Sequence, residues 1–238
     1  MLAIADERIS NDCKSALKQF GYSVLTLPSF PLLSKPVSSH PDMLIFIINN
    51  TIITHKLYYD IAKTQIDKIS KAANLKLILS YEKVSCVYPD DVLFNGALVG
   101  NRLIGNLNFL SMHIKEQAKR SGIELIHTNQ GYAKCSLCPV SDNAIITADN
   151  SVFEAAQKNG IDVLKITEGY IELKGYNYGF IGGAAGVDRE NVYFCGHLEN
   201  HPNGKEINAF LKKYNKKAVS LSKEKLYDFG TVMLIDKK

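Results

Sequence analysis

The residue types that can do covalent chemistry gather in three short segments of this chain. They are His40-Pro41-Asp42, Asp90-Asp91 and Lys134-Cys135-Ser136. A thiolate is a nucleophile, an imidazole moves protons and carboxylates bind cations, so these groups together suit cysteine chemistry on a cationic substrate. The three segments are far apart in the sequence, so only the fold can bring them to one place.

The composition is that of an ordinary soluble globular protein. The chain has 238 residues, 46% of them apolar and 22% charged, with a net charge of +4. This charge is too small and too dispersed to favour nucleic-acid binding. No apolar run approaches the length of a membrane span, and the N-terminus lacks the basic leader of a signal peptide. Five cysteines, an odd number, favour reduced thiols and a cytoplasmic location. None of these features specifies an oligomeric state.

Helical periodicity recurs five times along the chain. The five segments have starts that lie about 43 to 54 residues apart, and they cover residues 10–20, 58–73, 108–121, 151–159 and 205–214. A short apolar run follows the first, third, fourth and fifth segments and is typical of a strand. Regular spacing of this kind indicates an internal repeat.

A predicted hairpin precedes each of the last four helices. The hairpins cover residues 43–54, 92–105, 133–147 and 180–195, with Asn, Asp and Gly at their turns. The repeating unit is therefore strand–strand–helix–strand. The fifth copy is divided between the two ends of the chain, because residues 231–235 and 2–5 are its predicted hairpin strands. If these strands pair, the repeat closes into a ring without exposed edges. The alternative is a two-domain α/β protein in which the copies are coincidental.

This fivefold repeat resembles the α/β-propeller of the guanidino-group-modifying enzymes, the pentein superfamily. The segments GYAKCSLC at 131–138 and YNYGFIGGA at 176–184 resemble an uncharacterised bacterial branch of it. The resemblance covers the whole chain and implies a single five-bladed α/β-propeller domain over residues 1–238. It also implies a small-molecule ligand at one mouth of a central channel lined by the first strand of each hairpin. Enzymes of this superfamily use a cysteine, a histidine and carboxylates, whereas a ribosome anti-association factor with this fold acts by binding.

Alignment of the hairpins on their turns predicts which residues face the channel. At one level it places Asp42, Leu93, Cys135 and Gly182. Two residues earlier, on the same strand face, it places His40, Asp91, Ala133 and Phe180. Since a slip of one residue reverses the face, this register decides which side chains converge.

The resemblance gives these residues their expected roles. Cys135 is the expected nucleophile, His40 the base, and Asp42 and Asp91 the anchors of a guanidinium group. Lys134 is expected to lower the pKa of the thiol if it lies close by. Each segment also has a plain structural explanation, as core packing or a turn, and only their convergence through the repeat supports the catalytic one.

Three further residues are expected to contact the ligand. Asn95 lies farther along the second hairpin, Gly182 belongs to the glycine-rich segment 179–186, and Tyr178 precedes that segment. Small residues let a ligand or a neighbouring strand approach the backbone. Tight packing around a narrow axis explains the glycines equally well, and capping of the core explains the tyrosine.

The chain departs from the enzyme pattern in its last repeat. Enzymes of the superfamily carry the nucleophile there, but residues 228–235 contain no cysteine. Either Cys135 has taken the role, giving a cysteine-dependent C–N hydrolase or amidinotransferase, or the protein binds its ligand without catalysis. Cys135 and Cys138 form a lone CxxC motif, which is too few ligands for structural zinc. We expect neither a metal nor another cofactor.

Overall fold

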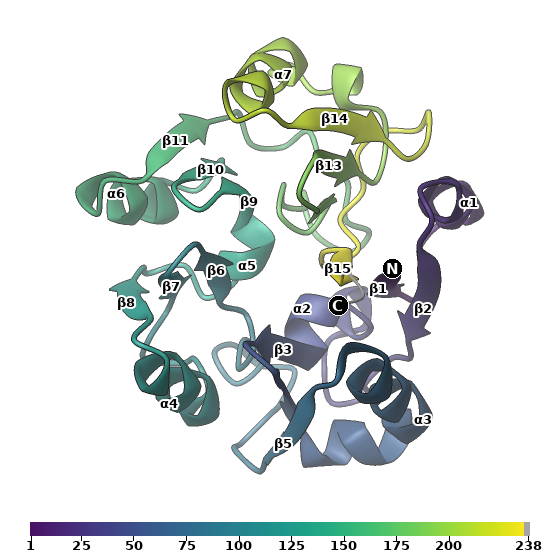
Figure 1. Ribbon diagram of the computed structural model, residues 1–238, viewed down its shortest axis with the longest axis vertical. Coiled ribbons are helices and arrows are strands. Elements are labelled where there is room, and N and C mark those ends of the chain that lie inside the picture. Colours follow the sequence, from purple (N-terminus) through teal and green to yellow (C-terminus); the bar gives the residue numbers. More distant parts are fainter. Residues whose placement is uncertain (236–238) are drawn as a thin grey trace.

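Five three-stranded sheets, each with one helix, make up the computed structural model, which describes residues 1–235. Figure 1 shows the sheets around a common centre, with the longer helices on the outside. In each repeat two antiparallel strands are followed by a helix and a third strand parallel to the second. The sheets match the pentein-like repeat predicted from the sequence.

The five repeats have similar elements. Each repeat is given in the order strand, strand, helix, strand. The first repeat is β3 (Ile45–Ile48), β4 (Thr51–His55), α3 (Lys56–Ala73) and β5 (Lys76–Ser80), and the second is β6 (Ala97–Val99), β7 (Arg102–Gly105), α4 (Met112–Arg120) and β8 (Glu124–His127). The third is β9 (Leu137–Ser141), β10 (Ala144–Thr147), α6 (Asn150–Lys158) and β11 (Asp162–Lys165), and the fourth is β12 (Ala185–Val187), β13 (Asn191–Phe194), α7 (Gly204–Lys213) and β14 (Lys217–Ser220). The fifth is β15 (Met233–Ile235), β1 (Leu2–Asp6), α1 (Asn11–Gln19) and β2 (Ser23–Leu27).

The two ends of the chain form one hairpin-like pair. β1 pairs antiparallel with β15, with Leu2 opposite Ile235 and Ile4 opposite Met233. β2 then pairs parallel with β1. The predicted pairing of the terminal strands is therefore confirmed.

The first strand of each repeat begins later than the sequence pattern predicts. Single helical turns, α2 (Pro41–Leu44) and α5 (Ala133–Ser136), precede β3 and β9. Pro41 occupies the first turn of α2, where its missing N–H costs nothing. Buried hydroxyls hold the ends of both turns, because Thr54 donates to the Leu44 carbonyl at 2.8 Å and Thr147 to the Ser136 carbonyl at 2.8 Å. The segments nearest the centre are therefore turns, and strand alternation does not apply to them.

A bulge shifts the register of the third repeat by one residue. Thr54 pairs with Ile45 in the first repeat, and Thr147 pairs with Leu137 in the third. The ladder between β9 and β10 is interrupted between Ala144 and Ile145, which places one extra residue on β9. Alignment on the turns was therefore wrong in this repeat. Lys134, not Cys135, is the equivalent of Asp42, and Cys135 is the equivalent of Met43.

The hydrophobic core is divided among the interfaces between repeats. One cluster joins β9 and β10 to β12, β13 and α7, through residues that include Ile146, Phe194 and Leu211. Another joins β1 to the first repeat, through residues that include Ile4, Ile52 and Ile66. Buried polar side chains, which include His40, Asp42 and Asn95, lie on the inner turns and loops that precede these sheets. Within residues 1–235 no helix is both long enough and apolar enough to cross a membrane.

The hydroxyl bonds that hold the inner turns predict a stability difference between two threonines of β4. Thr54→Val keeps the side-chain shape but leaves the buried Leu44 carbonyl without its donor, so we expect a loss of about 1–3 kcal/mol in the free energy of unfolding. Thr51, on the same strand, is 8% exposed and lines a depression of the surface, where water can reach its hydroxyl. Thr51→Val should therefore change stability by less than about 0.5 kcal/mol. Urea unfolding of both variants measures the difference. Equal losses would show that the hydroxyl bond does not stabilise the turn.

Candidate functional site

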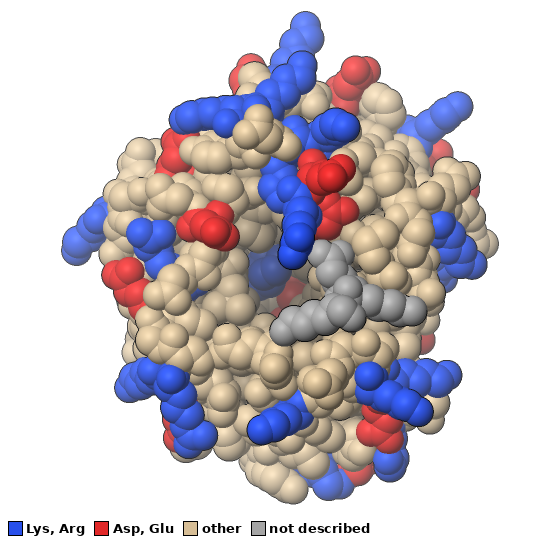
Figure 2. All heavy atoms as spheres, in the orientation of Figure 1, with Lys and Arg blue, Asp and Glu red and all other residues tan. Residues whose placement is uncertain are grey.

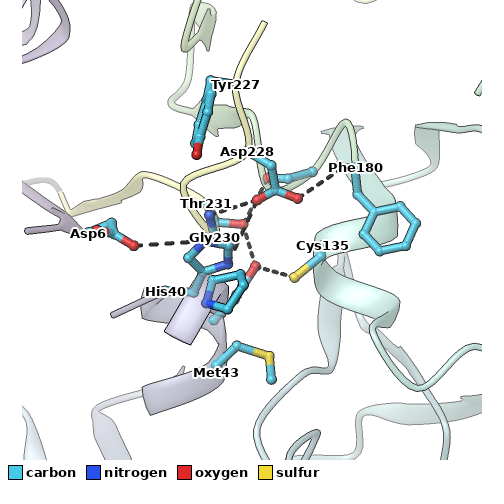
Figure 3. Close-up of polar contacts among 12 residues, drawn as sticks. Asp6, His40, Met43, Cys135, Phe180, Tyr227, Asp228, Gly230 and Thr231 are labelled. Carbon is cyan, nitrogen blue, oxygen red and sulfur yellow. Dashed lines mark hydrogen bonds and ion pairs between the residues drawn. The ribbon is translucent and has the colours of Figure 1, made fainter. Parts of the chain in front are cut away.

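Three of the predicted residues meet at the centre of the molecule. A ring nitrogen of His40, a carboxylate oxygen of Asp42 and the Sγ of Cys135 lie within 4.8 Å of one another. Asp42 Oδ2 accepts hydrogen bonds from Cys135 Sγ and from Thr231 Oγ1, both at 3.0 Å. Figure 3 shows how His40, Cys135 and Thr231 converge from the start of α2, from α5 and from the segment before β15. These three side chains and Asp42 are all buried.

His40 lies between two carboxylates. Its Nε2 is 3.8 Å from Asp6 Oδ2, and its Nδ1 is 3.8 Å from Asp228 Oδ1 (Figure 3). Neither ring nitrogen has a hydrogen-bond partner. Burial lowers the pKa of His40 and outweighs the attraction of the two carboxylates. The imidazole is therefore neutral at neutral pH.

Asp228 is fixed by backbone N–H groups. Phe180 donates to its Oδ2 and Gly230 to its Oδ1, each at 2.8 Å. Burial nevertheless raises the pKa of Asp228 above its usual value. Two glycines make room for Asp228 and for His40. A Cβ on Gly183 would lie 2.0 Å from Asp228 Oδ1, and a Cβ on Gly230 would lie 2.1 Å from the Cβ of His40. Any larger residue at either position would displace the carboxylate or the imidazole.

The thiol of Cys135 is not activated in this arrangement. Burial raises its pKa well above the usual value, and the neighbouring charge of Asp42 raises it further. Asn95 Nδ2 donates to Sγ at 3.2 Å, which opposes the shift only in part. Cys135 is therefore a protonated thiol at neutral pH, and it donates a hydrogen bond to Asp42.

Lys134 interacts with Thr231 and Asp42. Its Nζ donates to Thr231 Oγ1 at 2.9 Å, and its charge lowers the pKa of Asp42, although burial raises that pKa overall. The pKa of Cys135 lies above its usual value, so Lys134 does not bring it below that value as the sequence analysis expected. The register shift explains this, because Lys134 occupies the position equivalent to Asp42 on its own turn.

Asn95 is a positioning residue. Its Oδ1 accepts the backbone N–H groups of Lys134 at 2.8 Å and Cys135 at 3.2 Å. Its Nδ2 lies 3.3 Å from the Asp42 carbonyl oxygen. One buried amide thus links the turns that carry the carboxylate and the thiol.

A small cavity with aromatic walls adjoins this cluster. It has a volume of about 100 Å³, and Cys135, His40 and Asp228 line it. Its other lining residues are Val37, Tyr132, Leu173, Tyr176, Tyr178 and Phe180. The predicted ligand residue Tyr178 lines this cavity, and its hydroxyl donates to Glu168 at 3.1 Å. A thiol, an imidazole, a carboxylate and four aromatic rings therefore line the same cavity.

Asp91 acts on this cavity only through a neighbour. Tyr132 donates its hydroxyl to Asp91 Oδ2 at 2.5 Å, so the tyrosine ring stands between Asp91 and the cavity. Burial raises the pKa of Asp91. The geometry makes Asp91 an anchor of Tyr132, whereas the sequence analysis expected it to contact a guanidinium group.

A second, larger cavity lies along the inner strands. Its volume is about 270 Å³, and Asp42, Lys134, Thr231 and Gly182 line it together with apolar residues of β3, β12 and β15. Figure 2 shows a hollow near the centre of the visible face. A Cβ on Gly182 would lie 2.1 Å from the Leu137 carbonyl oxygen. The close approach of the neighbouring backbone therefore accounts for this glycine.

The predicted ligand residues are thus divided between two cavities. His40, Cys135 and Tyr178 face the smaller one, Lys134 and Gly182 face the larger one, and Asp42 reaches from the larger cavity to the thiol. Cys138 also lines the larger cavity, and burial raises its pKa to about 12. The two cysteines of the CxxC motif therefore face different cavities and do not form a joint ligand pair. Among the described residues, His40, Asp42 and Cys135 are the one group with a metal-ligating arrangement.

Sequence reasoning missed Asp6, Asp228 and Thr231. Asp228 and Thr231 lie just before β15, which is the first strand of the divided repeat. Extending the repeat alignment to this fifth copy would have placed them beside the inner turns of the other four. Thr231 has a φ of 72°, in the left-handed region. Its side-chain bonds to Asp42 and Lys134 help to hold this uncommon conformation.

Comparison with known proteins agrees with this architecture. A family model described as "Family of unknown function (DUF6873)" matches residues 4–233. No curated protein matches the chain in sequence. Among solved structures, dimethylarginine dimethylaminohydrolase from Pseudomonas aeruginosa in complex with citrulline aligns with a TM-score of 0.60 at 9% identity, over 93% of this chain and 91% of that one.

Two further structures are similar. An amidinotransferase from Microseira wollei aligns with a TM-score of 0.56 at 14% identity, over 89% of this chain and 73% of its own. Agmatine deiminase of C. jejuni aligns with a TM-score of 0.52 at 11% identity, over 93% of this chain and 76% of its own. These enzymes are penteins that modify guanidino groups. The resemblance predicted from the sequence is therefore confirmed at the level of the fold.

Replacing Asp42 by Asn tests whether burial governs the cluster. Burial raises the folded-state pKa of Asp42 above 3.8, its value as a free side chain. The folded protein then binds more protons than the unfolded chain, so this carboxyl makes the free energy of unfolding fall as pH rises from about 3.8 through the raised pKa. Asp42→Asn keeps an acceptor for Cys135 and Thr231 but does not titrate. Its stability relative to the unmodified protein should therefore rise with pH, by about 1.4 kcal/mol per unit of pKa elevation.

Urea unfolding from acidic to neutral pH measures this difference. Asp162→Asn is the matched control, because Lys213 and Tyr214 lower the pKa of Asp162 and that variant should lose stability relative to the unmodified protein as pH rises. A difference between Asp42→Asn and the unmodified protein that does not change with pH would contradict a raised pKa.

Proposed function

Since the chain belongs to the family described as "Family of unknown function (DUF6873)" and has the pentein fold, we propose that it binds a small cation bearing a guanidino or amidino group. The ligand occupies the aromatic cavity beside Cys135. The observation that carries this proposal is the shared lining of that cavity, in which a thiol, an imidazole and a carboxylate face four aromatic rings.

The lining of the cavity favours a cation over an anion. The faces of aromatic rings attract a guanidinium or amidinium group, and the effect is stronger where water is excluded. Asp228 supplies a negative charge at the same wall when it is ionised. A volume of about 100 Å³ corresponds to about three water molecules at about 30 Å³ each. This is room for a planar head group of four heavy atoms, so the rest of the ligand extends outward past the tyrosines.

The cluster can also carry out covalent chemistry on a bound head group. Cys135 Sγ attacks the central carbon of the ligand, and Asp42, which already accepts the S–H hydrogen bond, takes the thiol proton. A bound cation opposes the effect of Asp42 on the thiol and favours the thiolate. The carbon–nitrogen bond then breaks and the amine leaves with a proton. A water or a second amine releases the carbon from sulfur, which distinguishes a hydrolase from an amidinotransferase.

His40 remains the proposed base, as the sequence predicts, but it does not take the proton of the thiol. It is neutral, and the thiol donates to Asp42 rather than to the imidazole. We assign to His40 the transfer of protons to the leaving amine and from the incoming water or amine. Its two unpartnered nitrogens support this assignment, since a proton carrier needs one free acceptor.

The architecture proposed for this function is a single five-bladed α/β-propeller over residues 1–238, closed by the pair of β1 and β15. Residues 236–238 of this span lie outside the described structure. In this architecture the inner turns of the five blades hold the cluster between two cavities. The central position of the cluster favours one ligand site per chain.

The second candidate is a protein that binds the same kind of cation without catalysis. The raised pKa of Cys135 favours it, since an unactivated thiol reacts slowly. In that case the aromatic walls and Asp228 bind the ligand, and Cys135 is only part of the floor of the cavity.

Labelling with a chloroacetamidine tests the proposal. This reagent is an electrophile with a cationic head, and chloroacetamide is its neutral counterpart. We expect the amidine to modify Cys135 at least about tenfold faster than the amide, which corresponds to about 1.4 kcal/mol of preferential binding. Peptide mapping by mass spectrometry locates the label. Guanidino compounds that bind in the cavity should slow it.

Two cysteine variants and one aromatic variant complete the test. Cys135→Ser should remove the cation-selective label, and Cys138→Ser, altered at the other cysteine of the motif, should keep it. Phe180→Ala should reduce the selectivity by opening the aromatic wall. Equal slow labelling by both reagents would contradict covalent chemistry at Cys135. Protection of the protein from thermal unfolding by guanidino compounds, without any labelling, would establish the binding-only candidate.

A further inference from the structure

Two other cysteines belong to the hydrophobic cluster between the fourth repeat and the divided one. Cys13 belongs to the first turn of α1, and Cys195 directly follows β13. Both are free thiols, and both line the same cavity. They belong to the same hydrophobic cluster, with exposures of 1% and 2%.

A third cavity gives reagents a path to this pair. Its volume is about 420 Å³, and both cysteines line it together with Ser10, Glu172, Ser222, Glu224, Lys225, Tyr227 and Phe229. Lys225 and Glu172 form an ion pair at 3.2 Å, and their side chains are 72% and 55% exposed. Since these two residues are largely in solvent, the cavity opens to it.

The surroundings make Cys13 the reactive partner. The Cys195 thiol and the hydroxyls of Ser10 and Ser222 lower the pKa of Cys13 to about 7, against the opposing effects of burial and of the Asp12 charge. The positive end of the α1 dipole acts in the same direction. The pKa values of Cys195, Cys135 and Cys138 are all raised. Of these four buried cysteines, Cys13 is therefore the one with substantial thiolate character near neutral pH.

We propose that Cys13 and Cys195 form a thiol–disulfide exchange site for small disulfides. The Cys13 thiolate attacks one sulfur of a low-molecular-weight disulfide, forms a mixed disulfide and releases one thiolate. The Cys195 thiol loses its proton and attacks the sulfur of Cys13, which forms the Cys13–Cys195 bond and releases the second thiolate. The protein dithiol loses two electrons and two protons, and the small disulfide is reduced to two thiols.

This site is connected to the central cluster through the backbone. Tyr227 donates its N–H to the Cys195 carbonyl at 2.9 Å, and Tyr227 and Phe229 line the third cavity. Asp228 lies between them in sequence and lines the aromatic cavity. Oxidation of the pair therefore acts on the segment that positions Asp228. The exchange reaction itself does not depend on the function proposed above.

Oxidation of the full-length protein in glutathione buffers tests the proposal. After reduction and removal of the reductant, the native protein is incubated with increasing ratios of oxidised to reduced glutathione. We expect the loss of two thiols and a linked peptide pair that contains Cys13 and Cys195. Intact mass and peptide mapping measure both. The exposed Cys86 is expected to take up glutathione separately, and mapping distinguishes that product.

Three variants assign the steps. Cys195→Ala should stop at one glutathione bound to Cys13, Cys13→Ala should give neither product, and Cys138→Ala, a buried cysteine elsewhere, should leave the Cys13–Cys195 bond unchanged. Circular dichroism confirms that each variant is folded. Recovery of Cys13 and Cys195 as unlinked, unmodified peptides from the folded unmodified protein would overturn the proposal. Linkage that appears only in urea would overturn it as well.

Discussion

The burial of charged and titratable groups at the centre is the constraint on which the rest of this site depends. Each sheet covers its apolar face with its own helix and its neighbours, so the innermost turns are left with polar side chains. Among these, Asp42 and Asp228 are almost fully buried carboxyls. A buried carboxylate is costly unless donors surround it. Backbone N–H groups donate hydrogen bonds to Asp228. Thr231 donates a hydrogen bond to Asp42, and the charge of Lys134 stabilises the ionised form of that carboxyl.

This constraint determines which thiol is reactive. Cys135 donates to a carboxylate in a desolvated environment, and both effects favour the protonated thiol. Cys13 is equally buried, but its neighbours are another thiol, two hydroxyls and a helix N-terminus, which favour the thiolate. Burial alone therefore does not decide cysteine reactivity in this chain. Burial is the largest effect at Cys135, whereas at Cys13 the neighbouring thiol and hydroxyls outweigh it. A bound cation at Cys135 would oppose the effect of the Asp42 charge.

Much of the architecture was predictable because it depends on local patterns. Helical periodicity and turn residues recur in each repeat, and the pairing of the chain ends follows from the count of strands. The convergence of His40, Asp42 and Cys135 followed from the repeat. The exact register did not, because the bulge beside Ala144 leaves no distinct signal in an apolar strand. That one-residue shift places Lys134 in the position that was expected for Cys135. Lys134 therefore contacts Thr231, and the pKa of the thiol is raised rather than lowered. Asp228 was missed because its repeat is divided between the chain ends.

The unpartnered atoms of the cluster narrow the chemistry of its ligand. Both nitrogens of His40 and Oδ1 of Asp42 are buried without hydrogen-bond partners, and such groups are uncommon in folded proteins. A neutral imidazole has one acceptor nitrogen and one N–H donor, and a carboxylate has only acceptors when it is ionised. With Asp42 ionised, two of these three atoms are acceptors, so a group that completes the site must donate hydrogen bonds to them. A guanidinium group donates through five N–H bonds and accepts through none, and its planar faces suit aromatic walls. An ionised phosphate or carboxylate carries only acceptors, so it could satisfy the N–H of His40 but not the other two atoms.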